Sequence, residues 1–243
     1  MSLKIIFIIA ALSIVVNCFL LYMVAKYRNI VVIRNRGYQD LRPFPTYKND
    51  NYSFELLRND PSRFNNLTVF IGSSIVQRWN FKKYFQAQPF INRGIGNDTS
   101  EGMRKRFEKD VVDLKPKKTV IFTCANDVKC QISSVRSKEN LAYMLSRCLE
   151  ENITPIVFIL MPVLYSVNPS LRYSRPESEI KTMENALISL CHQMNVTYIY
   201  VREHLEKEKM LKSLYGKDGI HLNENGYALL SHIVIEKIRY PKQ

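Results

Sequence analysis

The sequence predicts an α/β domain built on a parallel sheet with helices on both faces, preceded by one helix that spans a membrane. Three features predict this arrangement: five short apolar runs, amphipathic stretches of helical length between them, and a long uncharged segment near the amino terminus. Short buried runs that alternate with helices are typical of parallel sheets covered on both sides. Ligands bind such sheets at the carboxyl ends of the strands, so the residues that follow each strand are the candidate functional residues.

The amino-terminal segment Ile5–Ala25 contains 21 residues without a charge. At the rise of an α-helix this length crosses the hydrocarbon core of a bilayer. The apolar stretch is long for a cleaved signal peptide, no small-x-small cleavage site follows, and Lys26 and Arg28 resemble an interfacial stop. We therefore expect residues 1–28 to form a membrane anchor.

The orientation of this anchor stays open at the level of sequence. Four basic residues follow the segment and one precedes it: Lys26, Arg28, Arg34 and Arg36 against Lys4. The positive-inside rule then places the following domain in the cytoplasm. A very short amino tail with a single lysine is also typical of signal anchors, which would export the domain, and we slightly favour export by analogy with the family named below.

Residues 29–65 are rich in polar and aromatic residues and contain several prolines. This composition indicates a linker that becomes ordered shortly before the domain begins. Residues 66–243 then form one domain with the alternating pattern. The predicted strands are Leu67–Ile71, Pro89–Asn92, Thr119–Thr123, Pro155–Met161 and Thr197–Val201. The predicted helices are Ser100–Asp113, Lys138–Glu151, Pro176–Met194, Arg202–Ser213 and Glu224–Ile238.

The charge and the absence of known motifs indicate which kinds of molecule the protein binds. Lys and Arg number 35 against 22 Asp and Glu, a net charge of +13, but the basic residues are scattered. The chain has no helix-turn-helix or zinc-finger spacing, so we expect no nucleic-acid partner. An anionic membrane or polysaccharide remains compatible with the charge. The oligomeric state is not predicted.

The cysteines do not predict a metal site. Four of the five lie in the expected domain, at Cys124, Cys130, Cys148 and Cys191, and they lack the close pairs of a zinc site. We expect buried thiols, leave open whether any pair forms a disulfide, and expect no metal or cofactor.

Polar residues follow the first three predicted strands and precede the last helix. The first strand leads into Gly72-Ser73-Ser74, the second into a turn with Gly94 and Gly96, and the third into Asn126. The last helix is preceded by Asp218-Gly219-Ile220-His221. Taken singly, a serine in a turn is usually a capping hydroxyl and an Asp-x-x-His turn is usually a helix cap. Together they supply the parts of an acyl-transfer site.

Acyl transfer needs a nucleophile, a base, a group that orients the base, and donors for the oxyanion. We assign Ser74 as the nucleophile, His221 as the general base and then acid, and Asp218 as the carboxylate that orients His221. The expected oxyanion donors are the backbone N–H groups of Ser74 and Asn97 and the side-chain amide of Asn126, because a glycine-containing turn leaves its N–H groups outside the sheet.

Four ordered blocks resemble the SGNH or GDSL hydrolases, and especially the branch similar to platelet-activating-factor acetylhydrolase. They are FIGSSIVQRW (70–79), INRGIGNDTSEGM (91–103), CAND (124–127) and DGIHLNENGY (218–227). The resemblance implies a flavodoxin-like three-layer α/β/α sandwich with a five-stranded parallel sheet. It also implies Ser74, Asn126, Asp218 and His221 in the roles given above.

Three positions depart from the family pattern. Ser73 stands where the family has Asp, Asn97 stands where it has the glycine of the oxyanion hole, and Cys124 replaces the leading glycine of the third block. Asn97 keeps a backbone donor but must adopt the local backbone angles. None of the three removes a group that transfers protons.

We therefore predict a membrane-anchored serine esterase that hydrolyses a small acyl ester, expected to be acetyl, on a small molecule, glycan or lipid. An exported domain favours an O-acetylated glycan, and a cytoplasmic one favours a lysophospholipid or acyl thioester. Two alternatives remain. The first is an O-acyltransferase that uses the same triad, because the sequence does not show whether water or a sugar hydroxyl accepts the acyl group. The second is an inactive binding module that kept the fold.

Overall fold

The computed structural model describes residues 16–19, 65–86, 88–123, 125–159, 163–202, 214, 216 and 218–239. Contacts divide the chain into two compact units, residues 1–43 and 44–243. Of the predicted anchor, only the helical residues 16–19 lie inside the described ranges, and of the predicted linker only residue 65. Among the residues described, none of the helices has the length and apolarity needed to cross a bilayer.

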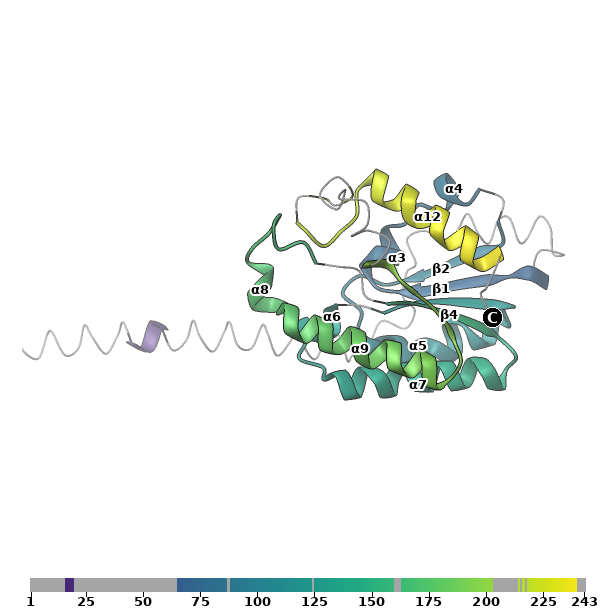
Figure 1. Ribbon diagram of the computed structural model, residues 1–243, viewed down its shortest axis with the longest axis horizontal. Helices are drawn as coiled ribbons and strands as arrows, with labels where there is room; N and C mark the ends of the chain where they lie inside the picture. Colours follow the sequence, from purple (N-terminus) through teal and green to yellow (C-terminus); the bar gives the residue numbers. More distant parts are fainter. Residues whose placement is uncertain are drawn as a thin grey trace, which may run out of the picture. The chain divides into compact units, whose positions relative to one another are not determined.

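The centre of the second unit is a five-stranded sheet in which every neighbouring pair is parallel (Figure 1). Its strands are β1 (Thr68–Gly72), β2 (Phe90–Gly94), β3 (Lys118–Phe122), β4 (Thr154–Ile159) and β5 (Thr197–Tyr200), in the order β2-β1-β3-β4-β5. This arrangement confirms the predicted α/β class and the five-stranded parallel sheet.

Helices cover both faces of the sheet (Figure 1). On one face lie α3 (Ser74–Arg78), α4 (Phe81–Tyr84) and α12 (Glu224–Arg239), and on the other lie α5 (Ser100–Asp110), α7 (Ser134–Glu150) and α9 (Glu177–Gln193). Two further short helices, α6 (Asn126–Lys129) and α8 (Leu171–Ser174), and a 3-10 turn (Val112–Leu114) lie in connections.

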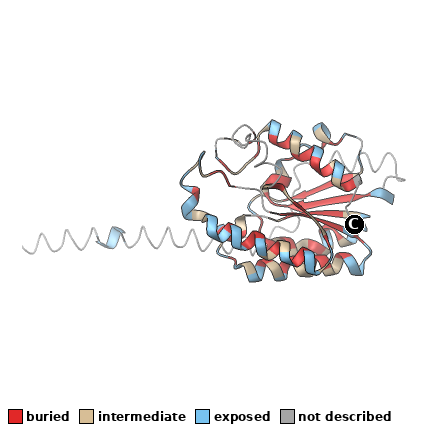
Figure 2. Ribbon diagram, viewed as in Figure 1, coloured by how far each residue is buried: buried red, intermediate tan, exposed pale blue. Residues whose placement is uncertain are grey.

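Two apolar cores fill the spaces between the three layers. Successive residues of a strand point to opposite faces, so Val69 and Ile71 of β1 join the core under α5, α7 and α9, while Phe70 between them joins the core under α12. Figure 2 shows β1 and β2 buried along their length; β3 and β4 are buried after their first residue, and β5 is mostly half-buried. Burial on both faces explains why the strands read as continuous apolar runs rather than alternating ones.

Trp79 anchors the second of these cores. Its side chain is fully buried among Phe70, Phe81 and Phe85, and its indole N–H donates to Ser231 Oγ at 2.9 Å. This bond joins the segment that follows α3 to α12. Trp79 is therefore a packing residue of this core.

The element boundaries differ from the prediction by a few residues. α5 ends at Asp110 instead of residue 113. α7 begins at Ser134 instead of residue 138, because the side chain of Ser133 caps the helix by accepting from Arg136 N. The short helices α3, α4, α6 and α8 were not predicted, because four or five residues are too few for helical periodicity to register. The predicted helix 202–213 lies outside the described residues after Arg202.

Candidate active site

The predicted nucleophile lies directly after β1. Ser74 is the first residue of α3, and it is partly buried at the carboxyl edge of the sheet. Gly94, at the end of the neighbouring strand β2, allows α3 to approach closely: a Cβ at this position would lie 2.2 Å from Gln77 N. The nucleophile turn is therefore fixed against β2 by a backbone contact that only glycine permits.

Ser74, His221 and Asp218 form one hydrogen-bonded chain. Ser74 Oγ lies 2.9 Å from His221 Nε2, and His221 Nδ1 lies 2.6 Å from Asp218 Oδ2. A carboxylate only accepts, so it selects the tautomer in which Nδ1 carries the proton and Nε2 accepts from the serine hydroxyl. This is the arrangement that a serine nucleophile with a histidine base requires.

The second half of that chain is built from one tight turn, residues 218–221, which we call the acid–base turn. Asp218 Oδ1 accepts from the backbone N–H groups of Ile220 and His221 at 3.0 and 2.9 Å. Burial acts to raise the pKa of Asp218, but the hydrogen bonds from the His221 ring and from the two backbone groups outweigh it and lower the pKa to about 2. Asp218 is therefore ionised at every pH at which the site would work.

Gly219 permits the turn to pack as it does. Its φ is +70°, and an added Cβ would lie 2.7 Å from the Leu164 carbonyl oxygen. The Gly219 carbonyl accepts from Leu164 N at 2.9 Å, which ties the turn to the segment after β4. The Asp-x-x-His spacing thus works because a glycine occupies the second position.

The turn after β2 carries the predicted backbone donor. Asp98 N donates to the Ile95 carbonyl at 3.2 Å, and Asn97 in this turn has φ +62°. Asparagine tolerates the left-handed region better than most residues. Asn97 therefore adopts the backbone angles that a glycine at this position would adopt, and it is exposed.

Asn126 begins α6 and lines the same cavity as Ser74. Its Nδ2 donates to the Asp98 carbonyl at 2.9 Å, and its Oδ1 accepts from Arg175 Nη2 at 3.1 Å. The first bond joins the turn after β3 to the turn after β2. Together the two bonds orient the amide, with Nδ2 toward Asp98 and Oδ1 toward Arg175. This orientation matters because the expected role of Asn126 requires Nδ2 to donate.

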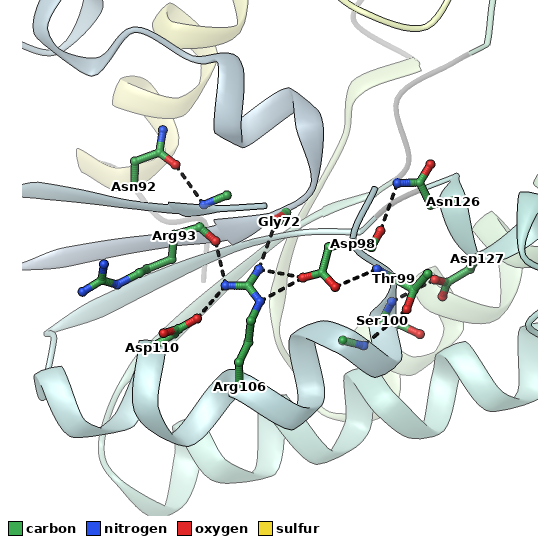
Figure 3. Close-up of polar contacts among 12 residues, drawn as sticks. Gly72, Asn92, Arg93, Asp98, Thr99, Ser100, Arg106, Asp110, Asn126 and Asp127 are labelled. Carbon is green, nitrogen blue, oxygen red and sulfur yellow. Dashed lines mark hydrogen bonds and ion pairs between the residues drawn. The ribbon is translucent and has the colours of Figure 1, made fainter. Parts of the chain in front are cut away.

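A partly buried guanidinium joins the turns that follow β1 and β2 (Figure 3). Arg106 of α5 donates to the carboxylates of Asp98 and Asp110 at 2.9 and 2.7 Å, and to the carbonyl oxygens of Arg93 and Gly72 at 2.8 and 3.2 Å. The fixed fork of five donors suits arginine to this work. The nucleophile turn and the turn after β2 are held in register by one side chain that sequence reasoning did not identify.

Asp127 holds the next turn to the start of α5. Its Oδ1 accepts from Ser100 N at 2.8 Å, and its other oxygen accepts from Ser137 Oγ. Burial raises the pKa of Asp127, although hydrogen bonds from Ser100 and Ser137 act in the opposite direction. Residues 72–74, 94–100 and 125–127, together with Arg106, form what we call the oxyanion side of the site.

A small cavity of about 30 Å³ opens beside Ser74. Its apolar walls include Ile75, Phe122, Val163 and Ile220, and its polar lining includes Ser74, Asn126 and Arg175. A water needs roughly 10–15 Å³ measured in this way, so the space suits an acyl group of about two heavy atoms beyond the carbonyl carbon at most. The segment after β4 that contributes Val163 and Arg175 showed no periodicity or motif in the sequence.

The structure brings most of the predicted site together. Ser74, His221 and Asp218 are hydrogen-bonded in series, Asn126 shares the cavity with Ser74, and Asn97 lies in the adjoining exposed turn. Among the described cysteines of the second unit, Cys130, Cys148 and Cys191 are free thiols, the last two buried as expected. Cys124 lies outside the described residues. Within the same ranges no three acidic, histidine or cysteine side chains cluster as a metal site would.

Comparison with known sequences decides the family. The sequence profile of the GDSL-like Lipase/Acylhydrolase family matches residues 70–229. The chain belongs to this family. The four sequence blocks had indicated this family.

Two curated relatives match over part of their length. An uncharacterized lipoprotein, YqeF, of Bacillus subtilis is 31% identical over 106 residues, which cover 35% of this chain and 44% of that protein. The N-acylneuraminate cytidylyltransferase of Escherichia coli is 23% identical over 199 residues, which cover 79% of this chain and 45% of that protein. The chain spans less than half the length of these relatives.

Solved structures share the fold. A lipase/acylhydrolase from Enterococcus faecalis has a TM-score of 0.63 at 23% identity, over 73% of this chain and 99% of that one. A candidate platelet activating factor protein from Streptococcus pneumonia gives 0.63 at 18% identity, over 93% and 99%. An acetylxylan esterase from Geobacillus stearothermophilus gives 0.57 at 14% identity, over 72% and 94%. They agree with the predicted three-layer α/β/α fold.

Proposed function

We propose that this SGNH hydrolase removes a small acyl group, acetyl in the first instance, from an ester through an acyl-Ser74 intermediate, and that an amino-terminal helix anchors it to a membrane. The observation that carries the proposal is the 2.9 Å contact between Ser74 Oγ and His221 Nε2, together with the 2.6 Å contact between His221 Nδ1 and Asp218 Oδ2. No other arrangement of roles uses all three groups.

In the first half of the reaction, Ser74 Oγ attacks the acyl carbon while its proton moves to His221 Nε2. Negative charge develops on the carbonyl oxygen, which the backbone N–H groups of Ser74 and Asn97 and the amide of Asn126 would stabilise. The tetrahedral intermediate then collapses, the ester C–O bond breaks, and His221 returns its proton to the departing alcohol.

In the second half, water takes the place of the alcohol. His221 removes a proton from that water, its oxygen attacks the acyl carbon, and the bond to Ser74 Oγ breaks as His221 returns the proton to the serine. Acetate is released and the triad is restored. Throughout, ionised Asp218 stabilises the imidazolium and holds its tautomer.

The size of the cavity supports a short acyl group. Its volume of about 30 Å³ and its apolar walls suit a methyl or ethyl group, and a long acyl chain would displace buried side chains. The acetylxylan esterase among the similar structures acts on an acetylated glycan, and the relative from Escherichia coli is named for a sugar acid. An O-acetylated glycan is therefore our first choice of substrate.

The membrane anchor rests on the uncharged segment Ile5–Ala25 and on the similarity to a bacterial lipoprotein. Fusions of alkaline phosphatase and of a fluorescent protein to the carboxyl terminus test its orientation. Phosphatase activity without fluorescence supports export and a glycan substrate, whereas fluorescence alone directs the search to lysophospholipids and acyl thioesters. Recovery of the chain in the soluble fraction contradicts the anchor.

Labelling with a fluorophosphonate tests the proposed nucleophile. The probe forms a bond between Ser74 Oγ and phosphorus as fluoride leaves, so we expect labelling of the wild type, none of Ser74→Ala, and strong loss in His221→Ala. His192→Ala is the matched control, because this exposed histidine in the last turn of α9 contacts Tyr198. A folded wild type that does not label contradicts the proposal and favours a binding module.

Hydrolysis of p-nitrophenyl acetate with and without an added sugar distinguishes water from a sugar hydroxyl as acceptor. We expect free acetate as the only acyl product, at a rate that does not depend on the sugar. An acetylated sugar among the products would identify an O-acyltransferase with the same triad instead.

A further inference from the structure

The segment between β4 and α9 delivers an arginine to the catalytic cavity. Arg175 follows α8, is only 5% exposed, and lines the cavity together with Ser74 and Asn126. Its backbone is held on both sides: its N–H donates to the Leu171 carbonyl at 2.7 Å, and its carbonyl accepts from the Tyr165 hydroxyl at 2.7 Å. A buried cation at this position calls for an explanation, because burial of a charge is costly.

The contact between Arg175 and Asn126 is directional. A guanidinium only donates, so the 3.1 Å bond from Arg175 Nη2 exists only while Asn126 Oδ1 faces it. The Asp98 carbonyl only accepts, so the 2.9 Å bond from Asn126 Nδ2 demands the same orientation. If the amide turned over, both contacts would become repulsive, and a lone pair would take the place of an N–H donor in the cavity.

We propose that Arg175 is a positioning residue for the oxyanion hole: it locks the amide of Asn126 so that Nδ2 serves as donor, and its charge strengthens that donor. The inference rests on the proposed function. A charged donor on the amide oxygen draws electron density from Nδ2, which makes its remaining N–H a stronger donor.

A double-mutant cycle between Arg175 and Asn126 tests the inference. Arg175→Met keeps much of the length and removes the donors and the charge, and Arg175→Lys keeps the charge. The readouts are kcat and KM on p-nitrophenyl acetate and the second-order rate constant for fluorophosphonate labelling of Ser74, which needs no knowledge of the natural substrate. Melting temperatures establish that each variant is folded.

We expect Asn126→Ala to lower kcat by about 10²–10³-fold, the usual cost of one oxyanion donor. Arg175→Met should lower kcat by about 10–100-fold with KM changed less than about threefold, and Arg175→Lys should recover part of the loss. In the Asn126→Ala background, Arg175→Met should cost less than about threefold, because the group through which it acts is gone. Labelling rates should follow the same order.

Arg172→Met is the matched control. Arg172 lies on α8, the short helix that Arg175 follows; it is exposed and stacks on the Tyr165 ring at 5.3 Å without lining the cavity. Its replacement should leave kcat within about twofold.

An unchanged kcat in Arg175→Met overturns the inference, and so does an equal loss in the wild-type and Asn126→Ala backgrounds. If Arg175→Met does not fold, the same cycle with Arg175→Lys decides between these outcomes. A wild type that neither hydrolyses the ester nor labels contradicts the proposed function itself, and the inference with it. An active wild type with additive effects contradicts the inference alone.

Discussion

The two halves of the active site are held by different kinds of interaction. The oxyanion side is tied by bonds between residues far apart in the chain: Ser100 N to Asp127 is buried, and Arg106 to Gly72 and Asn126 to Asp98 are partly buried. The acid–base turn is held mainly by bonds within four residues, and the side chain of Asp218 is 47% exposed. Backbone bonds from Leu164 N to the Gly219 carbonyl and from Gly216 N to the His221 carbonyl are among its links to the rest of the domain.

This difference separates stability from catalysis. Removal of a buried charged partner leaves another charge without compensation in the interior, so changes on the oxyanion side should affect the free energy of unfolding. Changes in the acid–base turn remove contacts that water can largely replace. They should lower activity while the fold keeps its stability.

The largest effect is expected for His221→Ala. Without a base, Ser74 keeps its proton, and kcat/KM on p-nitrophenyl acetate should fall by about 10⁴-fold. The melting temperature should move by less than about 3 °C, since the ring is partly exposed and the turn keeps its backbone bonds. Thermal unfolding followed by circular dichroism measures the second quantity. A large loss of stability in this variant would remove the proposed distinction between the two halves.

Arg106→Met should show the opposite behaviour. The buried carboxylates of Asp98 and Asp110 lose their shared cation, and a broken buried pair of this kind costs about 3–5 kcal/mol of unfolding free energy. For a domain of this size, the melting temperature should fall by about 10 °C. Denaturant unfolding gives the free energy directly.

Arg104→Met on the same helix is the control for Arg106. Arg104 stacks on the Tyr143 ring at 4.7 Å and donates to Asn140 Oδ1 at 3.3 Å. Because this contact is partly exposed, its loss should cost about 1 kcal/mol or less. Equal destabilisation by the two replacements would contradict the special place of Arg106.

The same division explains what the sequence could predict. Ser74 after a buried strand and the Asp218-x-x-His221 turn are local patterns, and a local pattern is visible in the chain. The alternation of apolar runs also predicted the sheet, since burial of Val69, Phe70 and Ile71 on two faces leaves a continuous signal. The structure confirms the sheet and places Ser74 and the Asp218-x-x-His221 turn together, and each of these features depends on neighbours in sequence.

Arg106 and Arg175 could not be found in this way. Each resembles an ordinary surface arginine until the fold places it against acceptors from other strands. The contacts that tie other turns together, from Arg106 to Arg93 and Gly72 and from Arg175 to Asn126, span 13, 34 and 49 residues, and no spacing encodes them. The short helices α6 and α8 that present Asn126 and precede Arg175 also fall below the length at which periodicity is informative.

Asp218→Asn should have an intermediate effect on activity and little effect on stability at neutral pH. The amide no longer selects the tautomer of His221 with a full charge, so kcat should fall by about 10²–10³-fold. Its oxygen can still accept from the Ile220 and His221 backbone groups, which preserves the turn. Steady-state kinetics measures the first effect, and Asn223→Ala, a cap of α12 outside the triad, provides a control for changes near the turn. Full activity of Asp218→Asn would show that the ring needs no carboxylate.

The smallest effect is the pH dependence of stability. The folded pKa of Asp218 is about 2 and its unfolded pKa is about 3.9, so the folded state binds its proton less tightly. The stabilisation from Asp218 is therefore present above about pH 4 and is lost as the pH falls toward 2. Because the side chain is 47% exposed, solvent screening should limit it to about 1 kcal/mol.

Denaturant unfolding of wild type and Asp218→Asn at pH 7, 5, 4, 3 and 2.5 isolates this contribution, because titration of all other groups cancels in the difference. The difference should be constant down to about pH 4 and then shrink.

For Asp127, whose pKa burial raises, the folded state binds the proton more tightly, so wild type should gain stability relative to Asp127→Asn as the pH falls. The stability difference between wild type and variant should therefore change with pH in opposite directions at the two positions. The same direction at both would contradict the view that hydrogen bonds outweigh burial at Asp218 whereas burial outweighs hydrogen bonds at Asp127.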